Sequence, residues 1–78
     1  MTIGQATAKR IDEYLFAKGI SLYRLAQDSG IPIATLQNLY RGHTKSPTLA
    51  LIYKLCDALQ VTVQEFLDSP LFLDLELD

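Results

Sequence analysis

The chain is poor in the residues from which disulfides, metal sites and catalytic centres are built. Its 78 residues contain one cysteine and one histidine. A single cysteine cannot form an internal disulfide, and the reducing cytoplasm is the expected compartment. One histidine without a second ligand at a suitable spacing provides neither a metal site nor a Ser–His–Asp set. We therefore expect no metal, no cofactor and no enzymatic activity.

Long apolar runs and an excess of positive charge are missing as well. No stretch approaches the roughly 18 apolar residues of a membrane span, and MTIGQATAKR at the N-terminus lacks the apolar segment of a signal peptide. The formal net charge is −2. Residues 1–67 carry seven basic and five acidic side chains, whereas residues 68–78 (the tail) carry four acids and no base. We therefore expect a soluble protein without a membrane partner, with a weakly basic body and an acidic tail.

Hydrophobic residues, in contrast, make up 49% of the chain, which is enough for a real core. A chain of this length forms one domain and buries only about 60–65% of the surface that its unfolded form exposes. Its stability is therefore marginal, and a partner subunit would increase it. Most of the scattered aromatic residues are expected in the core or at its edge, namely Tyr14, Phe16, Tyr23, Tyr40 and Tyr53.

Apolar residues recur every three to four positions and predict five helices. The expected helices cover residues 5–18, 22–28, 32–40 and 49–59, with a short one after Thr62. Thr62 and Glu65 have the spacing of a capping box, and Ser21 and Thr48 are the expected N-caps of the second and fourth helices. Cys56 falls in the apolar stripe of the fourth helix and is expected to be buried.

Residues 21–40, SLYRLAQDSGIPIATLQNLY, carry the most informative pattern of the chain. A small residue, Ala26, lies four positions before Gly30, and apolar residues flank both. Two short helices joined by a tight turn need a small side chain where they approach, a glycine at the turn and apolar residues inside. The inward-facing residues are expected to be Leu25, Ile31, Leu36 and Leu39.

This segment, together with the RGHTKSPTLALIYKLCDAL that follows, resembles the DNA-binding domain of the phage repressor and Cro family, also called the XRE family. The likeness covers about residues 5–67. It implies an all-α, five-helix bundle of the lambda-repressor type, with a helix–turn–helix DNA-binding domain at residues 1–67. It also implies a repressor-like transcriptional regulator that binds double-stranded DNA sequence-specifically as a homodimer.

In this family the third helix enters the major groove, and its N-terminal side chains touch base edges. The matching positions here are Ile33, Ala34, Thr35 and Asn38. Asn38 can pair bidentately with adenine, and Thr35 can offer its hydroxyl to a base or a phosphate. Ile33 and Ala34 can only pack on thymine methyl groups, and Ile33 has the alternative of packing on its own domain or on a partner.

Phosphate contacts are implied at the start of the second helix and in the loop after the third. The matching residues are Ser21, Arg41, His43, Thr44 and Lys45. Each of the loop residues has the alternative of being an ordinary solvated side chain.

Several positions depart from the family pattern. Leu22 stands where members often carry a phosphate-clamping glutamine, and Ile33 where they often carry arginine or glutamine. Both changes reduce the expected polar contact with DNA. They leave an alternative function open, a protein-interaction module whose third helix presents Ile33 and Leu22 to a protein partner. Leu15 and Tyr40 stand where some phage repressors place an Arg–Glu pair, so an apolar contact is expected there.

The tail ends in LFLDLELD, in which leucines alternate with Phe72, Asp74, Glu76 and Asp78. A period of two predicts a strand with a leucine face and an acidic face. A lone strand has no partner for its backbone groups. We therefore expect it to pair with the tail of a second copy as a dimerisation strand, or to dock its leucines on a neighbouring groove. The alternative is a frayed or helical tail, because leucine favours helices.

Overall fold

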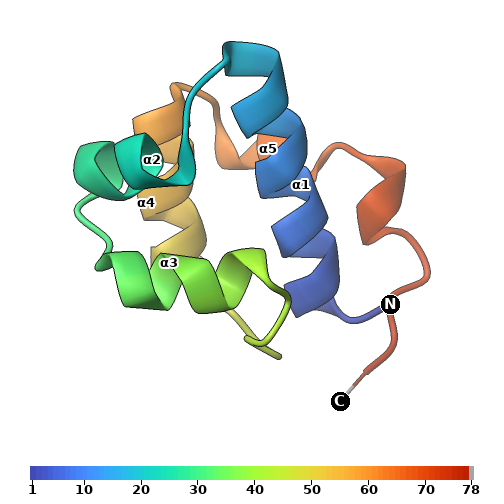
Figure 1. The fold of residues 1–78 in the computed structure, drawn as a ribbon. Coiled ribbons are helices and arrows are strands. Elements are labelled where there is room, and N and C mark those ends of the chain that lie inside the picture. Colours follow the sequence, from blue (N-terminus) through green and yellow to red (C-terminus); the bar gives the residue numbers. More distant parts are fainter. Residues whose placement is uncertain (78) are drawn as a thin grey trace.

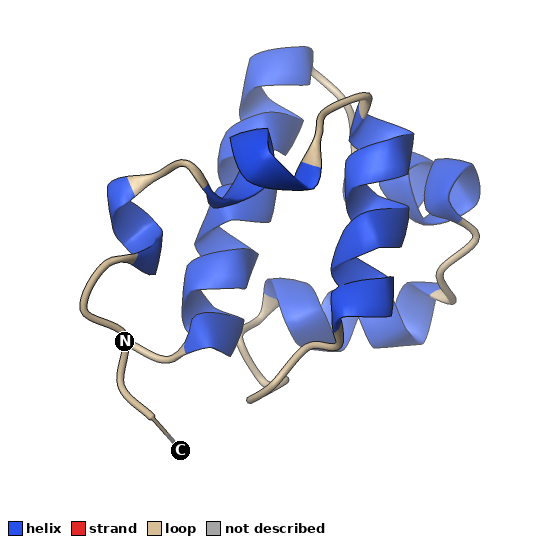
Figure 2. Cartoon of the chain, turned by 180° about the vertical axis from the view of Figure 1, so that it is seen from behind, coloured by secondary structure: helices blue, strands red, loops and turns tan. Residues whose placement is uncertain are grey.

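The computed structural model of the protein describes residues 1–77, which form five α-helices and one 3₁₀ turn (Figure 1). The elements are α1 (Ile3–Lys18), α2 (Leu22–Ser29), α3 (Ile33–Tyr40), α4 (Leu49–Leu59), α5 (Val63–Leu67) and η1 (Pro70–Phe72). These 77 residues contain no strand (Figure 2). The all-α, five-helix fold predicted from the sequence is confirmed. None of these helices is long and apolar enough to cross a membrane.

The helices are arranged so that α3 occupies one end of the bundle. In Figure 1, α1 and α4 stand upright and α3 lies across their lower ends. The α3 helix contacts both α1 and α2, and α2 also packs on α4. At the other side, α5 contacts α4, and η1 lies against α1. One side of α3 is therefore covered by the bundle, and its other side faces outward.

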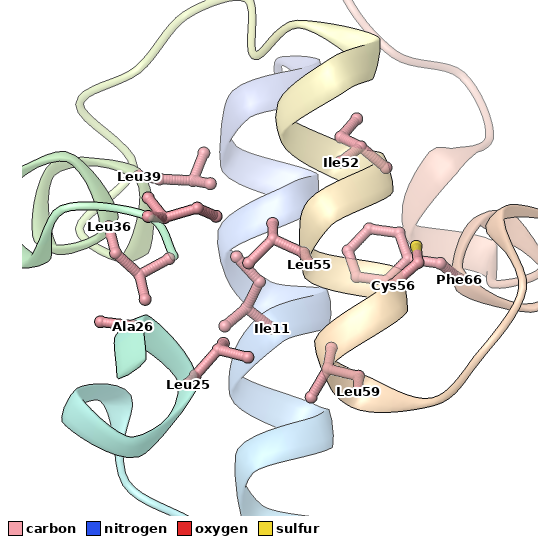
Figure 3. Packing of buried hydrophobic residues seen from close by; sticks show 11 residues of the cluster. Ile11, Leu25, Ala26, Leu36, Leu39, Ile52, Leu55, Cys56, Leu59 and Phe66 are labelled. Carbon is pink, nitrogen blue, oxygen red and sulfur yellow. The ribbon is translucent and has the colours of Figure 1, made fainter. Parts of the chain in front are cut away.

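The core is built from aliphatic side chains that the helices direct toward one another (Figure 3). The four residues predicted inside the helix–turn–helix are all buried, with no more than 3% of their surface exposed, namely Leu25, Ile31, Leu36 and Leu39. Ile11 of α1 lies near the middle of the cluster in Figure 3, and Phe66 lies on the side toward α5. Cys56 is buried, as predicted, and burial raises the pKa of its thiol.

The predicted caps are present, because a cap depends only on residues within one turn. Thr62 and Glu65 form the reciprocal capping box of α5. The hydroxyls of Ser21 and Thr48 accept hydrogen bonds from backbone N–H groups three residues further on.

Two helix starts differ from the prediction. The α1 helix begins two residues earlier than expected, because Thr2 and Gln5 form a capping box with hydrogen bonds of 2.9 and 3.2 Å. The α3 helix begins one residue later, because the ψ angle of Pro32 is 138° and places this residue outside the helix. The α2 helix also continues one residue further than expected, to Ser29.

The aromatic residues are more exposed than predicted. Three of the five expose most of their surface, Phe16 at 89%, Tyr23 at 67% and Tyr53 at 63%. Phe16 lies five residues after the buried Ile11, which rotates it by roughly 140° to the far side of α1. The core is therefore mainly aliphatic, apart from the cluster around Phe66.

Arg10 joins α1 to the C-terminal end of α5. Its Nε donates a hydrogen bond to the carbonyl oxygen of Phe66 at 2.8 Å, and its Nη2 donates one to that of Glu65 at 2.7 Å. The guanidinium also lies 4.7 Å from the centre of the Tyr14 ring, which stacks on the buried Phe66 ring. A charged donor thus adds hydrogen bonds to carbonyl groups at the end of the short helix, where that of Glu65 also accepts the N–H of Asp68. The side chain of Arg10, one of the seven basic residues, therefore stabilises the packing of α1 on α5.

The described part of the tail, residues 68–77, does not form the predicted strand. Pro70–Phe72 form the 3₁₀ turn η1, and residues 73–77 are irregular. The ring of Phe72 lies 6.0 Å from that of Phe66, so this residue is an anchor on the body of the protein. The contact between the Phe72 and Phe66 rings thus outweighs the tendency of the alternating tail sequence to form a strand.

Beyond η1 the tail folds back on the N-terminus. The backbone N–H of Glu76 donates a hydrogen bond to the carbonyl oxygen of Met1 at 3.0 Å. Pairing of the tail with a second copy stays a prediction, as does the division into residues 1–67 and 68–78. Asp78, predicted on the acidic face, lies outside the described residues.

Candidate functional site

The site is built on the tight turn between α2 and α3. Gly30 ends α2 with a φ angle of 73°, and its N–H donates a hydrogen bond to the carbonyl oxygen of Ala26 at 3.0 Å. This left-handed conformation favours glycine. The next residue, Ile31, is buried in the core. The turn and its buried anchor therefore fix the direction in which α3 leaves α2.

The outer side of α3 gathers several of the predicted reading residues. Its two leucines are fully buried, whereas Ala34, Thr35 and Asn38 are exposed. Ala34, Asn38 and Arg41 follow one another at spacings of four and three, so they lie along the same side. The reading face, defined here as Ala34, Thr35, Asn38 and Arg41, is thus continuous, and three of its four residues are polar.

Ile33 is placed differently from these residues. Its side chain is partly buried and packs against the hydrophobic core, and so does that of Leu22. This placement corresponds to the alternative in which Ile33 packs on its own domain. It also leaves less apolar surface for a protein partner at this position.

The loop of residues 41–48 continues directly from the end of α3. The N–H of Gly42 donates a hydrogen bond of 3.0 Å to the carbonyl oxygen of Leu39. The N–H of His43 donates one of 2.9 Å to the carbonyl oxygen of Asn38. These bonds tie the start of the loop to the last turn of α3.

The side chains that this loop presents are mostly exposed. Arg41, His43 and Lys45 are exposed, and Thr44 is partly buried. Among residues 1–77, Arg41 and Lys45 take part in no ion pair. Ser21, at the start of α2, is also exposed, although its oxygen already accepts the capping bond. The residues predicted to contact phosphates therefore lie at the surface, Thr44 only in part.

The α1 helix supports this loop through a close backbone contact. A Cβ atom added at Gly4 would lie 1.7 Å from the carbonyl oxygen of Thr44 and 3.1 Å from that of Lys45. No side chain fits in this space, so glycine is required by the approach of the two segments. The position of the loop therefore depends on the first turn of α1, which the sequence pattern did not indicate.

A hydrogen bond between side chains also joins α1 to the end of α3. The hydroxyl of Tyr40 donates to a carboxylate oxygen of Asp12 at 2.5 Å. This hydrogen bond, with burial and the nearby negative charge, raises the pKa of Tyr40 above its usual 10.0. The sequence predicts an apolar contact between Leu15 and Tyr40, but the α1 partner of the tyrosine is polar and lies about one turn earlier.

A hollow of about 350 Å³ opens between α1 and the end of α3. It is lined by Gln5, Ala8, Lys9, Asp12, Tyr40, Arg41 and Gly42. Lys9 and Arg41 bring two exposed cations to it from different helices, and Lys9 has no ion-pair partner within residues 1–77. A phosphate oxygen is a suitable ligand for such a pair. Lys9 was not among the predicted site residues, because helical periodicity does not show which neighbour the outer side of a helix meets.

The described residues include no group of three or more histidine, cysteine, aspartate or glutamate side chains that could hold a metal ion.

Comparison with protein families gives an independent result. A family model described as the Cro/C1-type HTH DNA-binding domain matches residues 10–70. The match includes α2, the turn, α3 and the loop after it. No curated protein and no solved structure shows significant similarity to the chain.

Proposed function

The chain belongs to the Cro/C1-type helix–turn–helix DNA-binding domain family, and from this premise we propose that it regulates transcription by reading double-stranded DNA with α3. The observation that carries the proposal is the reading face. Asn38 and Thr35 are exposed on it, next to Arg41. An α-helix fits the major groove, where an asparagine amide can bond both N6 and N7 of adenine. Ala34 is small enough to pack on a thymine methyl group.

Residues around the reading face would position the protein on the phosphates. The proposed contacts are those implied by the family resemblance, Ser21, Arg41, His43, Thr44 and Lys45. The hollow beside Arg41 adds Lys9 of α1 to this set. Such contacts set orientation and affinity but carry no sequence information. A repressor-like regulator of the cytoplasm would act by occupying a promoter in this way.

The alternative, a protein-interaction module, has less support. It needs an exposed apolar surface on α3, but Leu22 and Ile33 are partly buried against the core. The exposed residues of α3 include the polar Thr35 and Asn38, and Arg41 and Lys45, which form no ion pair within residues 1–77, lie in the segment that follows.

One experiment separates base contacts from phosphate contacts. Asn38→Ala should relax the preference at one base pair, at a cost of about 1–3 kcal/mol for the preferred duplex. Lys9→Ala, Arg41→Ala and Lys45→Ala should each weaken all duplexes alike and reduce the salt slope by about one. The measurements are selection from a random duplex pool and titration at several salt concentrations.

The control for the phosphate contacts is Lys54→Ala, which removes the same charge from the exposed side of α4. It should leave the salt slope unchanged. If the wild-type protein bound no duplex at about 50 mM salt, the proposed function would be wrong.

We also propose that the protein acts as a homodimer, with the two α3 helices in major grooves about 34 Å apart. Leu73 and Leu77 of the tail expose 70% and 98% of their surface, so both side chains are accessible to a second copy. A chain ending at Phe72 keeps the ring packing on Phe66 but loses these leucines. Light scattering should give the mass of a dimer for the full chain and of a monomer for the shortened one. A shortened chain that stays dimeric would refute the role of the tail.

A further inference from the structure

We propose that the acidic tail is an autoinhibitory segment, which lowers the affinity for DNA by holding carboxylates at the DNA-facing end of the molecule. The inference rests on the proposed function, because it concerns the same surface. Nothing in the family resemblance or in the reading face itself requires it.

The tail is fixed to the body of the protein at two points. The Phe72 ring packs 6.0 Å from the buried Phe66 ring. Four residues further on, the backbone N–H of Glu76 donates to the carbonyl oxygen of Met1 at 3.0 Å. A carboxylate oxygen of Glu76 also lies 3.3 Å from the Met1 amino group. The segment between the two points therefore follows a defined path along the N-terminal end of α1.

This path leads to the end of the molecule that carries α3. Met1 lies one residue before the cap of α1, and Gly4 touches the backbone of Thr44 in the loop after α3. The tail and the loop thus both contact the N-terminal segment of residues 1–4. Figures 1 and 2, which are related by a rotation about the vertical axis, both show the segment after η1 running down past the N-terminus to the level of this loop.

The charge of the tail opposes that of the surface beside it. Asp74 and Glu76 are exposed, with 73% of the Glu76 side chain accessible to solvent, and residues 68–77 contain no basic residue. The DNA-facing end gains its positive charge from Lys9, Arg41 and Lys45. Charges within the Debye length of about 10 Å at 0.1 M salt interact without full screening. Phosphates that approach this end therefore meet attraction from the loop and repulsion from the tail.

The proposal is tested by neutralising the tail with amides, which remove the charge that pairs with the Met1 amino group but keep a side-chain oxygen that can accept its hydrogen bond. The variant carrying Asp74→Asn and Glu76→Gln gains two units of charge and keeps all tail leucines, and Asn tolerates the positive φ of 55° at position 74. Fluorescence anisotropy with a mixed-sequence duplex should show about three- to tenfold tighter binding at about 50 mM salt. The difference should shrink toward none at about 300 mM salt, where the Debye length is shorter.

The matched control is Asp57→Lys, which also adds two units of charge. Asp57 is exposed in the last turn of α4, and α4 runs from the end beside α3 to the opposite end (Figure 1). This variant should bind the duplex within about twofold of the wild type, because its charge lies in the last turn of α4, toward the end opposite α3.

The outcomes are distinct. Tighter binding by the tail variant alone supports autoinhibition. Unchanged or weaker binding by it, or an equal gain in the control, overturns the inference while the proposed function stands. If neither the wild-type protein nor any variant binds the duplex at about 50 mM salt, the proposed function is wrong. The proposed autoinhibition is then wrong as well.

Discussion

Replacing Arg10 with alanine is expected to lower the free energy of unfolding by about 2–4 kcal/mol. The side chain is 18% exposed and donates to the carbonyl oxygens of Glu65 and Phe66. Alanine would leave these carbonyls without their charged donor and remove the cover from the Tyr14 ring. A domain of this size is stable by only about 5–15 kcal/mol, so the loss is a large fraction of the total. The melting temperature should fall by roughly 10–20 °C.

Two variants show whether this loss comes from the hydrogen bonds of Arg10. Arg10→Lys keeps the charge but not the planar group that reaches two carbonyls at once, and it should recover less than half of the lost stability. Lys54→Ala removes an exposed basic residue and should change the free energy of unfolding by no more than about 0.5 kcal/mol. An Arg10→Ala protein that melts within a few degrees of the wild type would show that the α1–α5 contact is not important for stability.

Gly4→Ala is expected to lower both stability and DNA affinity. In an ordinary helix this change stabilises by about 0.5–1 kcal/mol. Here the new Cβ would lie 1.7 Å from the carbonyl oxygen of Thr44, so the loop or α1 must move. Overpacking of this kind costs about 1–3 kcal/mol. Displacement of the loop should also misplace Lys45, which we expect to weaken duplex binding about tenfold through lost phosphate contacts.

Gly19→Ala is the matched control for this change. Gly19 follows the last residue of α1 as its C-cap, and a Cβ there meets no atom within 4 Å. Its φ angle of 64° makes alanine unfavourable by about 1–2 kcal/mol. Both variants should therefore melt earlier in circular dichroism, and only Gly4→Ala should bind DNA more weakly. Equal DNA affinity for the two variants would contradict the proposed support of the loop by α1.

Features that depend on nearby residues could be predicted from the sequence. The caps at Ser21, Thr48 and Thr62 involve residues within one turn, and each is present. The glycine turn after α2 and the buried leucines of α3 follow from spacing in the same way. The exposed side of α3 could be predicted because it is opposite the buried side.

Features that depend on distant residues could not be predicted. Gly4 and Thr44 are forty positions apart, and no periodic pattern links them. Helical periodicity predicts only that Arg10 lies on the outer side of its helix. The residues whose carbonyl oxygens it binds lie 55 and 56 positions away. The alternation of the tail predicts a strand, but Phe72 finds a ring on α5 and turns the chain. Local patterns therefore give the helices and the reading face, whereas the contacts that position them depend on the folded structure.

Amide chemical shifts recorded during titration with a duplex of about 20 base pairs test the central claim most directly. The claim is that α3 and the loop after it contact DNA. We predict shifts at Ser21, along the outer side of α3 and through residues 41–45, with little change in α5. Shifts confined to α4 and α5, or none at saturating duplex, would contradict the account.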